Sequence, residues 1–242
     1  MPHTLQQNLK KPPSFPLPFA VRAALAQQEL NSMDLSKKKG LIIFVRHGQT
    51  EWNVLKRMQG REDIPLNEQG LREAEITASG IKNACDKTGI AFDRVVSSPL
   101  LRASVTAQVI AKKIGCANVY CDENVTERDF GVLSGTSFDT NSKYIMKDVL
   151  DIPSLERVDS LLLRVNKFIT ENASVNENIL VVTHGAVTRI FADHAKRANG
   201  YEITAPFLLN CHLVVYTYDG ETPLLQGYNI PSQELDKFLE EI

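Results

Sequence analysis

The stretch LIIFVRHG, residues 41–48, decides the fold class of this chain of 242 residues. Its first five residues are all apolar, which predicts a short strand that is buried on both faces. The apolar run then ends in an arginine, a histidine and a glycine. In open α/β sheets, ligands bind just beyond the carboxyl ends of the parallel strands. The stretch therefore predicts a central parallel strand that places Arg46 and His47 at the ligand-binding edge of a sheet.

Helix and strand signals alternate along the rest of the chain. Apolar residues recur at helical spacing after Asn67, which is a preferred N-cap residue. Ser98 followed by Pro99 predicts another helix N-terminus, with Gly115 just past the end of that helix. The expected strands are 41–45, 92–96 and 178–182. The expected helices are 67–85, 98–115, 155–169, 184–198 and 232–242. Segment 131–151 is expected to be a polar loop, and segment 213–228 a hairpin with Asp219-Gly220 as its turn.

This alternation predicts an α/β fold, a three-layer α/β/α sandwich around a mostly parallel central sheet. No repeat or linker interrupts residues 40–242, so we expect them to form one domain. Residues 1–39 differ in composition, because they hold five of the 11 prolines and carry a net charge of +4, whereas the rest of the chain carries −6. We therefore interpret residues 1–39 as an N-terminal extension.

The composition argues against several classes of protein. The near balance of 27 Lys+Arg and 29 Asp+Glu disfavours a nucleic-acid-binding protein. No apolar run approaches the roughly 20 residues of a membrane-spanning helix, so no membrane association is expected. Four cysteines without a C-x-x-C pair predict reduced thiols. A cytoplasmic location is therefore expected. Organelle targeting by residues 1–39 is the alternative, because no acidic residue precedes Glu29 and transit peptides are poor in acidic residues.

Polar residues follow each of the three expected strands at its carboxyl end. Arg46 and His47 follow the first, Arg102 lies in the first turn of the helix after the second, and His184 follows the third. Because these strand ends meet at one edge of a parallel sheet, two imidazoles and two guanidiniums are expected to converge there. The planar guanidinium matches phosphate oxygens, and helix N-termini add partial positive charge. The sequence therefore predicts a phosphate site.

Two other kinds of phosphate chemistry lack their motifs in this sequence. There is no G-x-x-x-x-G-K-[ST] loop for a nucleotide and no H-E-x-x-H spacing for zinc. We therefore expect no metal and no cofactor, and a histidine as the nucleophile.

The ordered set of motifs resembles the histidine phosphatase superfamily, also called the phosphoglycerate mutase-like family. An isolated R-H-G is a weak signal, but the matching residues extend in order over roughly residues 41–228. They are Arg46-His47-Gly48-Gln49-Thr50-Glu51-Trp52-Asn53, Gly60, Asp63, Leu66, Gly70, Glu73-Ala74, Ser97-Ser98-Pro99, Arg102, Ala107, Glu127, Gly131, Gly135 and Thr183-His184-Gly185. The resemblance implies a phosphoglycerate mutase-like fold and a small phosphorylated metabolite as substrate.

The resemblance also implies a role for each residue of the site. His47 would take the phosphoryl group as a phosphohistidine, and Glu127 would act as general acid and then as general base. A protonated His184 would stabilise the phosphoryl charge together with the guanidiniums. The full implied substrate-binding set is Arg46, Asn53, Arg102, His184, Gln49 and Thr50.

Hydrolysis and phosphoryl transfer are the two main activities within this family. Mutases carry a long insertion between the acid and the second histidine, whereas here Glu127 and His184 are only 57 residues apart. The short interval favours a phosphatase, with a phosphoglycerate mutase as the alternative. An alternative of another class is a catalytically weak protein that binds phosphate or a partner, although the complete set of site residues argues against it. No motif predicts an oligomeric state.

Overall fold

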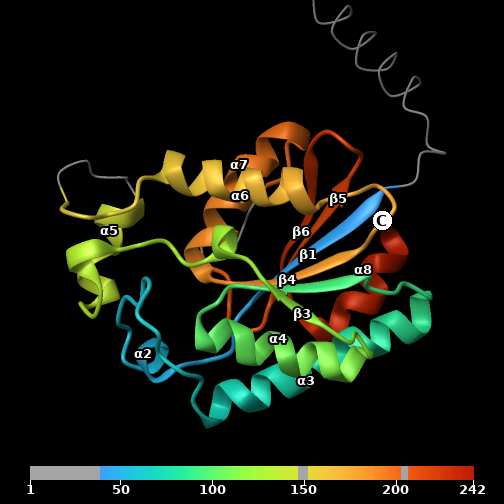
Figure 1. The fold of residues 1–242 in the computed structure, drawn as a ribbon, viewed down its shortest axis with the longest axis horizontal. Coiled ribbons are helices and arrows are strands. Elements are labelled where there is room, and N and C mark those ends of the chain that lie inside the picture. Colours follow the sequence, from blue (N-terminus) through green and yellow to red (C-terminus); the bar gives the residue numbers. More distant parts are fainter. Residues whose placement is uncertain (1–38, 147–151, 203–206) are drawn as a thin grey trace, which may run out of the picture. The chain divides into compact units, whose positions relative to one another are not determined.

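The computed structural model describes residues 39–146, 152–202 and 207–242. Within them, one sheet of six strands has the order β3-β2-β4-β1-β5-β6 (Figure 1). Strands β1 to β4 run parallel to one another. Strand β5 pairs antiparallel with β1, and β6 at the edge pairs antiparallel with β5. The strands are β1 (Gly40–Arg46), β2 (Arg94–Ser97), β3 (Val119–Cys121), β4 (Ile179–Thr183), β5 (Leu213–Tyr218) and β6 (Pro223–Ile230). The predicted α/β class with a mostly parallel sheet is confirmed.

Helices cover both faces of this sheet. Helices α3 (Glu68–Thr88), α4 (Leu101–Ile114) and α8 (Leu235–Glu241) pack on one face. Helices α6 (Val158–Asn172) and α7 (Gly185–Asn199) pack on the other. The two short helices α2 (Glu51–Val54) and α5 (Phe138–Met146) lie beyond the carboxyl ends of the parallel strands, at the left of Figure 1. The predicted three-layer sandwich is therefore confirmed.

Strand β1 divides its side chains between two separate cores. Successive side chains of a strand point to opposite faces of its sheet. Ile42 and Phe44 accordingly pack under α6 and α7, while Ile43 and Val45 pack under α3, α4 and α8. All four are at most 1 % exposed. Burial on both faces explains why this strand is a continuous apolar run in the sequence.

Several helix ends follow the sequence signals. Asn67 caps α3, because its Oδ1 accepts a hydrogen bond from the Gly70 backbone N–H at 2.8 Å. Helix α4 ends at Gly115, which adopts the left-handed conformation with φ of 78°. Glycine reaches this region without the steric cost of a Cβ. The predicted hairpin is also present, with β5 and β6 paired in antiparallel register.

Other predicted boundaries are wrong. Helix α4 begins at Leu101 and not at Ser98, because Ser98 and Pro99 still belong to the loop after β2. Helix α6 begins at Val158, so Leu155 precedes it. The segment predicted as a loop contains α5. Helix α2 and strand β3 were not predicted, since three or four residues are too short to show a period.

Residues 1–38 lie outside the described residues, so the division at residue 39 remains a prediction. No helix in the described ranges is long and apolar enough to cross a bilayer.

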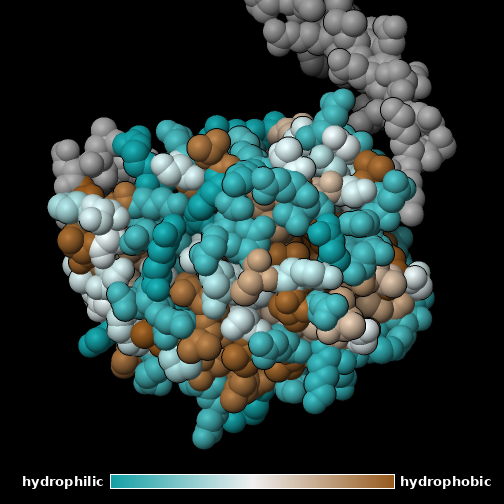
Figure 2. Space-filling model, viewed as in Figure 1, coloured by the Kyte–Doolittle hydropathy of each residue, from teal (hydrophilic) through white to brown (hydrophobic). Residues whose placement is uncertain are grey.

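Figure 2 shows the surface of the molecule in the view of Figure 1. Exposed hydrophobic side chains gather in the lower half of this view, over α4 and β3. Leu101 of α4 and Tyr120 of β3 are among the exposed apolar residues. Such exposure is ordinary in folded proteins and needs no functional explanation.

Candidate active site

The pairing of β1 with β4 brings the two predicted histidines together. These parallel strands are in register from Ile42–Ile179 to Arg46–Thr183, so the residue after each strand lies at the same level. The His47 backbone N–H donates to the Thr183 carbonyl at 3.0 Å. The ring centroids of His47 and His184 lie 5.2 Å apart, and both side chains are buried.

The loop after β1 passes so close to α3 that glycine is required. A Cβ on Gly48 would lie 2.4 Å from the carbonyl oxygen of Gly70. The Gly48 N–H donates to the Thr106 hydroxyl of α4 at 3.2 Å. Because Gly48 fixes the loop between two helices, His47 is held at the strand end.

Hydrogen bonding gives His47 a free ring nitrogen on the side suited to attack. His47 Nδ1 lies 2.7 Å from the carbonyl oxygen of Gly48, which accepts a hydrogen bond and therefore requires Nδ1 to be protonated. In the neutral ring, Nε2 then carries the lone pair. Burial lowers the pKa of His47 well below 6.5, and the charges of Arg102 and Arg46 lower it further. The imidazole is thus neutral and nucleophilic at neutral pH.

The surroundings of His184 disfavour the protonated ring when no anion is bound. Burial has the largest effect and lowers the pKa of His184 well below 6.5. The charges of Arg102, His47 and Arg164 lower this pKa further. Its Nε2 lies 2.7 Å from the hydroxyl of Ser98. Its Nδ1 is buried and has no hydrogen-bond partner. If the Ser98 hydroxyl donates to Nε2, the proton of the neutral ring sits on Nδ1.

The two arginines are held by backbone carbonyls, and the Nε of each remains without a hydrogen-bond partner. Arg102 is fully buried; its Nη1 donates to the Glu62 carbonyl at 2.6 Å and its Nη2 to the Gly60 carbonyl at 2.8 Å. Arg46 Nη1 donates to the Leu208 carbonyl at 2.5 Å. The Nε of each arginine is buried without a partner. Burial lowers the pKa of Arg102 to about 10, so the guanidinium stays charged at neutral pH.

Glu127 faces these cations from the loop that follows β3. The charge of Glu127 raises the pKa of both Arg46 and Arg102 and so opposes the effect of their burial. One carboxylate oxygen accepts from the Arg128 N–H at 2.8 Å and the other from the Ala186 N–H at 3.3 Å, at the start of α7. The side chain is nearly buried but still lines the open cavity of the site. Glu127 is therefore fixed at the cavity wall by two backbone donors.

A cavity of about 630 Å³ opens at this end of the sheet. Arg46, His47, Asn53 and Glu127 line it. Arg102 and His184 do not line it but are buried beside His47, since Arg102 lowers the pKa of both imidazoles. Five of the predicted catalytic residues are thus brought together. In the described part of the chain, no group of three His, Cys, Asp or Glu residues is arranged to hold a metal ion.

Two of the predicted substrate-binding residues are occupied elsewhere. Thr50 is buried, and its hydroxyl caps α2 by accepting from the Asn53 N–H at 3.2 Å. Gln49 Oε1 accepts from the Asn67 side chain at 3.0 Å. Neither residue lines the cavity. Asn53 does line it, and a further amide, Asn210, donates to the His47 carbonyl at 2.9 Å.

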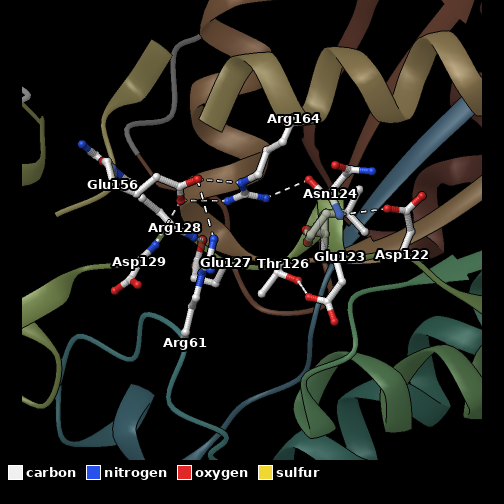
Figure 3. A network of polar contacts seen from close by, with 12 residues as sticks. Arg61, Asp122, Glu123, Asn124, Thr126, Glu127, Arg128, Asp129, Glu156 and Arg164 are labelled. Carbon is white, nitrogen blue, oxygen red and sulfur yellow. Dashed lines mark hydrogen bonds and ion pairs between the residues drawn. The ribbon is translucent and has the colours of Figure 1, made fainter. Parts of the chain in front are cut away.

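A buried ionic cluster supports the loop that carries Glu127, and the sequence analysis missed it (Figure 3). Arg164 of α6 forms a bidentate ion pair with Glu156, with N–O distances of 2.7 and 3.0 Å. The Glu156 carboxylate also accepts from the Asp129 N–H at 3.1 Å, and its carbonyl accepts from Arg128 Nε at 2.7 Å. The one signal of this cluster in the sequence is Arg164, which interrupts an otherwise apolar part of α6.

The comparisons with known proteins agree with this geometry. The family model of the histidine phosphatase superfamily (branch 1) matches residues 42–231. The chain is 30 % identical over 193 residues to the uncharacterized phosphatase PhoE of Bacillus subtilis (strain 168), with 79 % of this chain and 95 % of that protein covered.

Two solved structures share the fold. One is phosphoserine phosphatase from Entamoeba histolytica in complex with 3-phosphoglyceric acid, with 27 % identity, a TM-score of 0.63, and 78 % of this chain and 96 % of that one covered. The other is phosphoglycerate mutase from Bacillus anthracis str. Sterne, with 20 % identity, a TM-score of 0.66, and 84 % and 99 % covered. The fold is therefore phosphoglycerate mutase-like.

Proposed function

The chain belongs to branch 1 of the histidine phosphatase superfamily. From this premise, we propose that it is a phosphomonoester hydrolase. The proposed reaction goes through a phosphohistidine on His47 and uses no metal. One observation carries the proposal. Arg46 Nε, Arg102 Nε and His184 Nδ1 are buried next to His47 without a hydrogen-bond partner. Unsatisfied buried donors are costly, and the oxygens of a phosphoryl group are the acceptors that suit two guanidiniums and an imidazole.

In the first step, His47 Nε2 attacks the phosphorus of the substrate. The new P–N bond forms as the bond between phosphorus and the ester oxygen breaks. Glu127 gives its proton to the leaving oxygen, so that the product is a neutral alcohol. A dianionic substrate next to Glu127 favours the protonated form of the carboxyl that this step requires. Glu127 fits this role because backbone N–H groups hold it at the cavity wall.

In the second step, water attacks the phosphohistidine. Glu127, now a carboxylate, accepts a proton from that water, the P–N bond breaks, and inorganic phosphate leaves with His47 neutral again. Arg46, Arg102 and His184 stabilise the equatorial oxygens in both transition states. An anion bound beside His184 favours its protonated form, so the neutral ring of this structure and a charged ring in catalysis are compatible.

The decisive experiment combines turnover with trapping. The wild-type protein in EDTA should release phosphate from an aryl phosphate, with inhibition by vanadate, and acid-labile phosphate should be trapped on the protein. His47→Ala should abolish both signals. Absence of turnover and of trapped phosphate would leave the phosphate- or partner-binding alternative. Conversion of phosphoglycerate to its isomer, activated by the bisphosphorylated form, would instead identify a mutase.

Leaving groups of different basicity test the role of Glu127. Glu127→Gln should lower kcat most for alkyl phosphates, since their leaving oxygens need a proton, and least for an activated aryl phosphate. An equal loss for both substrates would show that Glu127 is not the general acid.

A further inference from the structure

The cavity extends far beyond the phosphoryl-binding residues, along helix α7. Its lining on this helix begins at Gly185 and Ala186, next to Glu127, and continues through Ile190 to Arg197. At 1.5 Å per residue, the 12 steps from Gly185 to Arg197 span about 18 Å. A phosphoryl group occupies only the first part of this length. The remainder is available to the leaving group of the ester.

Apolar side chains from several elements line part of the cavity. Leu162 and Val158 lie one helical turn apart on α6 and face the cavity with Ile190 of α7. Trp52 of α2 contributes an aromatic side chain to the lining, as does Phe138 of α5. Among the described residues of the lining, ten have apolar side chains: Trp52, Met58, Phe130, Phe138, Val158, Leu162, Ala186, Ile190, Phe207 and Leu208. The volume of about 630 Å³ is in the range of pockets that enclose a sizeable organic ligand.

Two ion pairs lie among the charged residues that line the cavity. Lys56 Nζ lies 3.0 Å from Asp139, and Arg189 Nε lies 3.0 Å from Asp193. The Arg57 guanidinium lies 6.0 Å from the centroid of the Trp52 ring. Arg57 and Arg197 also line the cavity and form no ion pair with the described residues.

We propose that the leaving group of the physiological substrate is a bulky apolar or aromatic body that lies along α7 against Leu162 and Ile190. This inference rests on the proposed phosphatase function and names its substrate class. Contacts to the non-reacting part of a substrate speed the chemical step when they are completed in the transition state. A substrate without the apolar body is therefore hydrolysed slowly even though its phosphate binds normally.

The test compares kcat/KM for 1-naphthyl phosphate, phenyl phosphate, O-phosphoserine and 3-phosphoglycerate. The first two differ in the size of the aromatic body but share an aryl oxygen as leaving group. We expect 1-naphthyl phosphate to exceed phenyl phosphate by about 10-fold, since each added apolar contact discriminates by roughly 10-fold or more. The two small acids should be poorer still.

Neighbouring leucines on α6 supply a matched pair of variants. Leu162 lines the cavity, whereas Leu163 is 74 % exposed and does not. Leu162→Ala should lower kcat/KM for 1-naphthyl phosphate by about 10-fold and change that for O-phosphoserine less than 2-fold. Leu163→Ala should change neither. Leu162→Phe, which fills the cavity without removing core volume, should also lower the 1-naphthyl value, and this covers the case in which the alanine variant is unstable.

The outcomes separate this inference from the function on which it rests. Equal rates for the two aryl phosphates, together with equal behaviour of the Leu162 and Leu163 variants, would overturn the apolar substrate class while leaving the phosphatase intact. Preference for 3-phosphoglycerate would also overturn it. If no substrate gives hydrolysis that depends on His47, the proposed function itself fails.

Discussion

At the scale of single residues, the site holds polar atoms in an unfavourable state. Each buried donor without a partner costs about 1–3 kcal/mol relative to a satisfied one. Arg46, Arg102 and His184 each contribute one such atom. Arg46 Nη1, Arg102 Nη1 and Nη2, and His184 Nε2 are hydrogen-bonded, and these contacts hold the side chains in place. The site is therefore organised for an anion before the anion arrives, as electrostatic catalysis requires.

Ser98 is expected to position His184 through their contact of 2.7 Å. Ser98→Ala should lower kcat by about 10-fold or more, because His184 loses the partner that fixes its tautomer. Ser98→Thr, which keeps the hydroxyl, should restore most of the rate. Ser104→Ala is the matched control, since the Ser104 hydroxyl bonds only within α4. A Ser98→Ala enzyme with unchanged kcat and pH profile would show that the contact is merely structural.

Stability should fall as the pH is lowered below 6.5. Burial and the neighbouring arginines lower the pKa of both His47 and His184 in the folded state. The unfolded chain then binds more protons than the folded one, so the free energy of unfolding decreases toward acid pH. Each histidine contributes at most about 1.4 kcal/mol per pH unit. Urea denaturation at pH 6.5 and pH 5 measures the slope, and His47→Gln should make it shallower; an unchanged slope would contradict the assignment.

The residues of the site were predictable where they stand next to a strand end. Arg46 is the last residue of β1, and His47 and His184 directly follow β1 and β4, so a linear pattern finds them. Ser98 was instead interpreted as a helix cap, because its partner lies 86 residues away in sequence. Asn210 reaches His47 from 163 residues away and had no signal. Hydrogen bonds that depend on the tertiary fold leave no local trace in the sequence.

At the scale of secondary-structure elements, α6 supports the loop that carries Glu127. The Glu156 cluster ties the backbone around Arg128 and Asp129 to Arg164. The Glu156 side chain is about 10 % exposed and that of Arg164 about 14 %, so neither charge is well solvated. Removing one member of such a buried pair typically costs 3–5 kcal/mol.

Glu156→Gln should therefore act on catalysis as well as stability. With the loop loosened, Glu127 should protonate leaving groups less well, so kcat should fall more for alkyl than for aryl phosphates. Glu171→Gln is the control on α6, because its pair with Lys167 is exposed and is worth at most about 1 kcal/mol. A uniform loss over all leaving groups would assign the cluster a purely structural role.

Long periodic elements were predicted well, and short or polar ones were not. Helices α3 and α7 carry many buried apolar residues at regular spacing, so their existence followed from the sequence. Strand β3 has three residues, and only pairing with β2 defines it. Helix α5 lies in a segment rich in Ser, Thr, Asn and Asp, which favour loops on average. Its position over the cavity therefore required the tertiary structure.

At the scale of the molecule, binding of an anion is expected to stabilise the fold. Any ligand that binds the folded state adds about 2.7 kcal/mol at a concentration 100 times its Kd. For a chain of this size that corresponds to roughly 5–10 °C in Tm. Vanadate or phosphate should produce such a shift in thermal denaturation, and Arg102→Met should abolish it. Arg72→Met, at a side chain 61 % exposed on α3, should not; equal shifts in both variants would place the anion elsewhere.

The central place of β1 in the sheet also bears on how the chain is made. Ile42 of β1 pairs with Ile179 on one side and with Tyr216 on the other, so its partners are synthesised 137 and 174 residues later. At about 5–20 residues per second, the second partner is translated roughly 9–35 s after β1. Until β4 is translated, the apolar strand β1 has neither of its neighbours in the sheet. Emerging from the ribosome, this strand is a natural target for chaperones, and folding of the sheet waits for nearly the whole chain.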